Sequence, residues 1–93
     1  AQSIAIGYIA AAESQGNDAI AIGTFSGEQV QGINAISIGN KAGCQHQNAF
    51  SIAIGAGAGC DGQAGNAIAI GELAGKEGQG INAISIGILG FFT

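Results

Sequence analysis

The sequence predicts an all-β protein, a parallel β-solenoid in which each coil contains sixteen residues. A short strand sequence that begins as Ile4-Ala5-Ile6-Gly7 recurs every sixteen residues, at 20–23, 36–39, 52–55, 68–71 and 84–87. Isoleucine alternates there with alanine or serine, the period of two that is typical of a β-strand. A fixed period of this length indicates that each repeat forms one coil and stacks on the next. We expect one domain over residues 1–93, with about six coils.

Each block of sixteen residues, counted from residue 1, has isoleucine at its fourth and sixth positions. We expect these side chains to fill the core as ladders along the stack, while the alanine or serine at the third and fifth positions lets another sheet approach closely. The predicted core ladder comprises Ile4, Ile6, Ile20, Ile22, Ile36, Ile38, Ile52, Ile54, Ile68, Ile70, Ile84 and Ile86.

The seventh position of every block is glycine. A recurrent glycine directly after a strand indicates a turn with positive φ or a close backbone approach. The predicted turn glycines are Gly7, Gly23, Gly39, Gly55, Gly71 and Gly87.

The second half of each block is more variable, but it keeps a glutamine at the fifteenth position. We expect a second, shorter strand around positions eight to ten, then a glycine turn and a polar turn back to the isoleucine strand. Glutamine amides in register can hydrogen-bond from coil to coil. The predicted polar ladder comprises Gln15, Gln31, Gln47, Gln63 and Gln79. The eighth, ninth and twelfth to fourteenth positions are expected to face solvent.

The charge and hydropathy of the chain exclude two classes of partner. Two lysines stand against six acidic residues, which gives a net charge of −4. Nucleic acid is a poor partner for such a surface, because its binding depends on basic residues. Glycine and polar residues interrupt every apolar run before the roughly 18 residues of a membrane helix, so we expect no membrane insertion by this segment.

The sequence predicts no catalytic residue, no cofactor and no metal site, and therefore no enzyme. The segment 71–76 resembles a phosphate-binding loop, but it is one residue short, and Glu77 replaces the Ser or Thr that would reach magnesium. His46 lies at a variable position without an acid or nucleophile nearby, so we interpret it as a solvated turn residue.

The two cysteines, Cys44 and Cys60, occupy the twelfth position of successive blocks. This spacing fits neither a metal-binding Cys-x-x-Cys motif nor a catalytic cysteine. In-register neighbours about 4.8 Å apart fall within the roughly 4.4–6.8 Å Cα range of a disulfide, provided that the side chains point along the stack. A stacked pair of thiols and a disulfide both remain open at this point.

The Asn-Ala-Ile-Ala-Ile-Gly sequence at 66–71, with its variants at 34–39 and 82–87, resembles the head repeats of trimeric autotransporter adhesins of the Yersinia adhesin type. Similar repeats occur in fibre proteins of phages and large viruses. The resemblance implies a left-handed parallel β-roll that associates as a homotrimer. It also implies an extracellular location, on a cell surface or virion fibre, and binding of host-surface or matrix proteins or glycans. The period of sixteen departs from the shorter spacing usual in the adhesin heads.

Three functions follow from this pattern. A surface-fibre or adhesin head is favoured over a self-assembling structural filament and over an ice-binding solenoid, in which the alanine and serine ladder would form a flat exposed face. In a fibre head the partner would meet variable outer positions, since folding explains the constant ones. The candidate contact surface comprises Tyr8, Phe25, Leu73 and Leu89.

Overall fold

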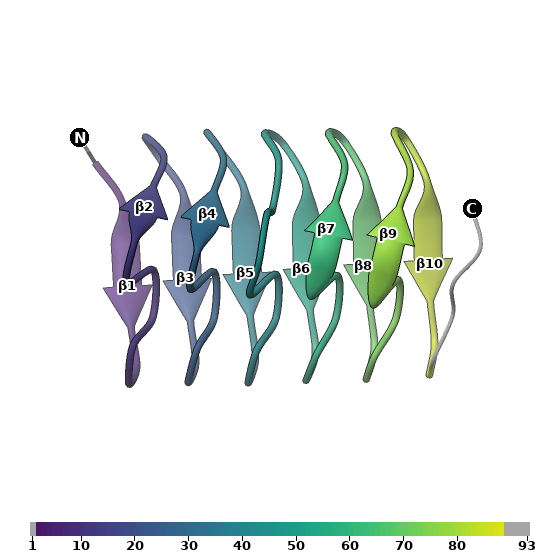
Figure 1. Ribbon diagram of the computed structural model, residues 1–93, viewed down its shortest axis with the longest axis horizontal. Coiled ribbons are helices and arrows are strands. Elements are labelled where there is room, and N and C mark those ends of the chain that lie inside the picture. Colours follow the sequence, from purple (N-terminus) through teal and green to yellow (C-terminus); the bar gives the residue numbers. More distant parts are fainter. Residues whose placement is uncertain (1, 89–93) are drawn as a thin grey trace.

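The chain folds into a β-solenoid of about five turns, with no helix among residues 2–88, the part of the chain that the computed structural model describes. Six strands form one parallel sheet, and shorter strands lie on the other side of the coils (Figure 1). The large sheet contains β1 (Ile4–Ile6), β3 (Ile20–Ile22), β5 (Ile36–Ile38), β6 (Ile52–Ile54), β8 (Ile68–Ile70) and β10 (Ile84–Ile86). The shorter strands are β2 (Ser14–Gln15), β4 (Val30–Gln31), β7 (Asp61–Gln63) and β9 (Glu77–Gln79).

The strands of the large sheet pair in register at an offset of sixteen residues. Ile20 pairs with Ile36 and Ile36 with Ile52, so the same position of each coil lies above its counterpart. Backbone hydrogen bonds join the coils along the whole circumference, for example from Ile20 N to the Ala35 oxygen at 2.9 Å. The predicted parallel solenoid with sixteen residues per coil is therefore confirmed.

Small side chains fill the interior of the roll. The central residues of the four middle strands, Ala21, Ser37, Ala53 and Ala69, are completely buried. They face Ala42, Ala58 and other small residues from the opposite side of the coil. Because neither layer carries a large apolar side chain inward, the two layers lie close together, and the shortest extent of the molecule is 14 Å.

The prediction that the isoleucines fill this interior is wrong. Successive side chains of a strand point to opposite faces, and here the alanines and serines point inward. The isoleucines therefore lie on the outer face of the large sheet: Ile6 is 59% and Ile86 69% exposed in the end coils, and the middle isoleucines are half-buried between their neighbours. The alanine and serine ladder, in turn, is not an exposed face.

The glycine after each strand of the large sheet has the predicted positive φ, between 118° and 128°. Close approach adds to this constraint: a Cβ on Gly39 would lie 2.8 Å from the carbonyl carbon of Gly55 in the next coil. Only glycine fits this column, because the backbone of one coil stacks directly on the backbone of the next.

The shorter strands lie at positions thirteen to fifteen of the coil, not at the predicted positions eight to ten, which form a turn. The glutamines at position fifteen point inward from this side of the coil, and Gln31, Gln47, Gln63 and Gln79 are buried. Each of these amide nitrogens donates to a backbone carbonyl of the large sheet, as Gln63 Nε2 does to the Ile52 oxygen at 2.6 Å. The glutamines thus tie the two sides of the coil together.

The predicted glutamine ladder is confirmed in the second half of the stack. Gln47 Nε2 donates to Gln63 Oε1 at 3.2 Å, and Gln63 Nε2 donates to Gln79 Oε1 at 3.0 Å. The side-chain oxygens of Gln31 and Gln47 are buried without a partner among the described residues. In the direction of the ladder these two oxygens would accept from Gln15 and Gln31, so the ladder is absent from the first coil to the third.

The side with the short strands is interrupted in the third coil. Gln47 makes isolated bridges to Gln31 and Gln63, and no extended strand forms around it. This side consequently divides into two pairs, β2 with β4 and β7 with β9, whereas the large sheet runs unbroken (Figure 1).

Candidate functional site

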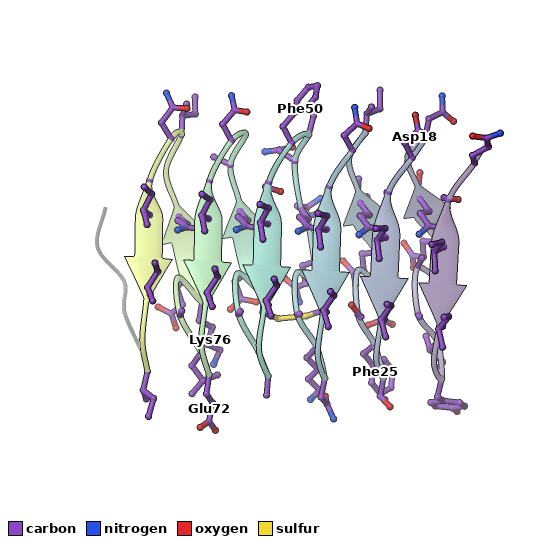
Figure 2. All side chains as sticks on the ribbon, turned by 180° about the vertical axis from the view of Figure 1, so that it is seen from behind. Asp18, Phe25, Phe50, Glu72 and Lys76 are labelled. Carbon is purple, nitrogen blue, oxygen red and sulfur yellow. A yellow bond between two sulfur atoms is a disulfide. The ribbon has the colours of Figure 1, made fainter. Side chains whose placement is uncertain are left out.

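Two surfaces of the molecule are candidates for function. The first, which we call the isoleucine face, is formed by the outward isoleucines of the six strands of the large sheet. Figure 2 shows this sheet from its outer side. Apart from the exposed isoleucines at both ends, it contains Ile70 at 37% exposure, so apolar surface continues along the stack. A contiguous apolar face of this kind is the usual mark of an association surface.

The second surface is a groove of about 590 Å³ that runs along the stack beside the turn at positions eight to ten. Numbering the coils from the N-terminus, its first edge is formed by the ninth-position residues of coils two to five: Phe25, Lys41, Gly57 and Leu73. The opposite edge is formed by the twelfth-position residues of the same coils: Glu28, Cys44, Cys60 and Lys76. None of the residues that line the groove belongs to the large sheet, so the two surfaces are separate.

A disulfide between Cys44 and Cys60 crosses the middle of the second edge (Figure 2). Their Cα atoms are 4.7 Å apart, the separation expected for stacked coils, and both residues are buried. The structure thus selects the bridged alternative of the two that the spacing left open. The disulfide joins the third and fourth coils, where the side with the short strands is interrupted.

The ninth-position residues of coils two to five that carry side chains are Phe25, Lys41 and Leu73. The Leu73 side chain lies over the buried Gly57, because its Cδ2 atom would be 2.6 Å from a Cβ on that glycine. A side chain at Gly57 would therefore displace Leu73, which lines the groove.

The first edge carries large side chains on strained backbone. Phe25, Lys41 and Leu73 have φ of 59°, 63° and 61°, in the left-handed region that large residues rarely adopt. This conformation costs roughly 1–2 kcal/mol per non-glycine residue. Gly57, with φ of 73°, shows that glycine fits the position. Large residues that persist at a strained position suggest a role for their side chains.

The groove contains both lysines of the chain, Lys41 and Lys76, and two of its six acids, Glu28 and Asp61. Among the described residues, none of these four side chains has a hydrogen-bond or ion-pair partner. Lys41 is exposed and Lys76 half-buried. Their ammonium groups and the two carboxylates are therefore available to a ligand. The groove thus contains both lysines of a chain with net charge −4, balanced by two acidic residues.

The four residues predicted to form the contact surface do not lie together in one environment. Tyr8 is 69% exposed and makes an edge-to-face contact with Phe25, with ring centroids 5.9 Å apart. Phe25 and Leu73 are half-buried at the edge of the groove, and Leu89 lies outside the described residues. The prediction of solvent-facing outer positions is wrong for Gly57 and for the cysteines, which are buried.

The other residues considered from sequence form no second site. His46 is exposed in the interrupted coil, and Lys76 of the segment 71–76 lines the groove. Residues 2–88 contain no group of three His, Cys, Asp or Glu residues that could hold a metal ion. They also contain no helix long and apolar enough to cross a membrane. Comparisons with protein families, curated proteins and solved structures find no match for this chain.

Sequence reasoning missed the groove as a unit, although a signal was present. Gly57 is the one glycine in the ninth column of coils one to five, and both lysines lie in the ninth and twelfth columns. The groove becomes visible when these two columns are compared across coils rather than read along each block, because a solenoid brings column neighbours together.

Proposed function

We propose that this chain is the head module of an extracellular fibre, in which three copies associate through the isoleucine face and leave the opposite side available for adhesion. The observation that carries the proposal is the outward direction of the isoleucines. Complete burial of an isoleucine is worth roughly 1.5–3 kcal/mol relative to exposure, so a face that repeats this residue twice per coil favours association strongly.

A second copy of the chain suits this face better than an unrelated partner. Every coil contributes isoleucines to the isoleucine face at the same spacing. The face of a second copy has the same spacing, so the two can match along their length. Symmetric association of identical chains is the common way of covering such a surface. The number three rests on the resemblance of the Asn-Ala-Ile-Ala-Ile-Gly strand to trimeric adhesin heads.

The disulfide supports an extracellular location on a cell surface or virion. Disulfides persist in oxidising environments and are rare in reducing ones. Cys44 and Cys60 form such a bond between neighbouring coils. The variable side of the coils then faces outward from the fibre, where host-surface or matrix proteins or glycans would be met.

Of the two alternatives to a fibre head, one loses its support and the other keeps it. Ice binding loses its basis in the alanine and serine ladder, because Ala21, Ser37 and Ala53 are completely buried. A self-assembling filament remains the second candidate, since the end strands β1 and β10 each have one unpaired edge among the described residues.

The experiment is a sedimentation-velocity measurement on the wild-type chain and on two matched variants. Ile54→Gln places an amide in the middle of the isoleucine face, whereas Ile33→Gln makes the same change at a corner residue that is 49% exposed. We expect a trimer for the wild type and for Ile33→Gln, and dissociation for Ile54→Gln. A folded wild-type monomer at micromolar concentration would contradict the proposal, and growth into long polymers would favour the filament.

A further inference from the structure

We propose that the groove binds an acidic saccharide, a short chain of sugar rings that carries a carboxylate. This inference deepens the proposed adhesive function by naming the site and the chemical class of its ligand. The site lies between the strained edge with Phe25 and Lys41 and the disulfide edge with Lys76.

The dimensions of the groove suit a ligand of two or three rings. Its volume is about 590 Å³, within the roughly 300–1,000 Å³ range of small-ligand sites. It spans four coils, and three coil spacings of about 4.8 Å give a length near 14 Å.

The charges of the groove select the ligand class. The unpartnered ammonium groups of Lys41 and Lys76 suit a carboxylate on the ligand. The carboxylates of Glu28 and Asp61 accept hydrogen bonds and are suited to the hydroxyl groups of a sugar. Phe25 adds an aromatic side chain against which the apolar face of a ring can pack. A saccharide with a carboxylate uses all three kinds of group.

An extended peptide fits this groove less well. Peptides that bind as an added strand need unpaired backbone donors and acceptors. Along the groove the backbone groups already bond between coils: Gln45 N donates to the Cys60 oxygen at 2.9 Å, and Asp61 N to the Lys76 oxygen at 2.7 Å. Gly57 N likewise donates to the Asn40 oxygen at 2.8 Å. Recognition must therefore come from side chains, as it does for sugars.

The test is a titration of the full chain with trigalacturonic acid, followed by amide chemical shifts in NMR spectra and by calorimetry. Maltotriose, a neutral trisaccharide of similar size, and tetraglutamate, an acidic peptide, serve as comparison ligands. We expect trigalacturonic acid to shift the amide signals of coils two to five and to bind at least tenfold more tightly than either comparison ligand.

Variants then locate the site. Lys41→Gln and Lys76→Gln should each weaken trigalacturonic acid about threefold to fivefold, as expected for partly exposed charge pairs. Gly57→Leu should abolish binding, because its side chain would displace that of Leu73, which lines the groove, and circular dichroism checks that the variant folds. Ala56→Leu, at an exposed neighbouring position outside the groove, and Glu72→Gln are the matched controls and should bind as the wild type does.

Three results would overturn the inference: no shift of groove signals with trigalacturonic acid, equal binding of maltotriose or tetraglutamate, or unchanged binding by Gly57→Leu. Sedimentation of the same samples separates this inference from the proposed function. A monomer that binds trigalacturonic acid would refute association through the isoleucine face and leave the groove assignment standing. A trimer that binds none of the ligands would refute the groove assignment and leave association through the isoleucine face standing.

Discussion

The two sides of this solenoid obey different constraints. The large sheet repeats the same residues in every coil, and its six strands pair without interruption. The opposite side divides into β2 with β4 and β7 with β9, and it holds the disulfide, the strained ninth-position residues and the groove. The uniform side meets the needs of stacking, and the difference between the two sides is the basis for proposing association on the first and recognition on the second.

The comparison also shows what a coil requires to fold. The interior columns, the seventh-position glycine and the buried glutamine repeat in the middle coils because each meets its own copy above and below. Phe25, Lys41, Gly57 and Leu73 occupy one column and differ in size and charge. Folding therefore tolerates variation in that column, which leaves its side chains for other purposes.

The largest expected effect comes from the seventh-position glycines. Gly39→Ala places a Cβ 2.8 Å from the Gly55 carbonyl carbon, at a φ of 125°. We expect loss of the folded state, because strain of this kind costs on the order of 1–3 kcal/mol before the clash is counted. Circular dichroism in a urea titration measures it. Gly80→Ala is the control, since a Cβ there meets nothing within 4 Å; equal stability of both variants would refute the stacking argument.

The disulfide comes next. Replacing Cys44 and Cys60 together by serine opens a loop of sixteen residues, for which chain-entropy arguments give about 3 kcal/mol. We expect a lower free energy of unfolding, with faster amide exchange at Gln45 and Asp61 but unchanged exchange at Ile36 in the large sheet. Denaturation and hydrogen exchange at one protein concentration measure both effects. Equal acceleration on both sides would show that the two sides are not independent.

The glutamine ladder should have a somewhat smaller effect. Gln63→Leu leaves the Ile52 carbonyl oxygen and Gln79 Oε1 without their donor. An unsatisfied buried group costs about 1–3 kcal/mol, and we expect a loss near 2 kcal/mol because the leucine packs in place of the amide. Gln29→Leu, at a half-buried position outside the ladder, is the control for added apolar bulk. A neutral Gln63→Leu variant would mean that packing, not hydrogen bonding, holds the two sides together.

The smallest effect concerns the strained edge of the groove. Lys41→Gly removes the strain of a left-handed conformation, which costs a non-glycine residue roughly 1–2 kcal/mol. It also adds about 0.5–1 kcal/mol of conformational entropy cost on folding, because the unfolded chain is more flexible at a glycine. We expect a slight gain in stability together with weaker binding of trigalacturonic acid. Asn40→Gly, one residue earlier and without positive φ, should lose stability. The melting temperatures of both variants test this prediction. A lower melting temperature for Lys41→Gly would refute the claim that the backbone at this position is strained.

The repeat period fixes the fold, and the remaining features depend on information that the period does not contain. Ile and Ala alternate equally well with either face inward, so the direction of Ile54 and Ala53 could not be deduced from periodicity. The short strands lie later in the coil than predicted because the ninth-position residues take a left-handed turn conformation, which Phe25 and Leu73 do not indicate by type. The groove is lined by columns whose residues vary from coil to coil, which the period does not describe.

For the cysteine pair, by contrast, the spacing along the sequence did predict the proximity of the two residues. Cys44 and Cys60 share a column, and parallel stacking brings column neighbours to the Cα separation of a disulfide. Whether they bridge depends on the direction of the side chains, which the structure supplies.

The central claim is that the isoleucine face is covered in solution. The most direct measurement is the solvent accessibility of isoleucine methyl groups, read from NMR relaxation by a soluble paramagnetic probe in the wild-type chain. We predict that the methyl groups of Ile38 and Ile54 are protected, whereas those of Ile33 and Ile81, which are exposed at the corner of the coil, relax strongly. Equal relaxation of all four residues would show that the face is open to water and would contradict association through it.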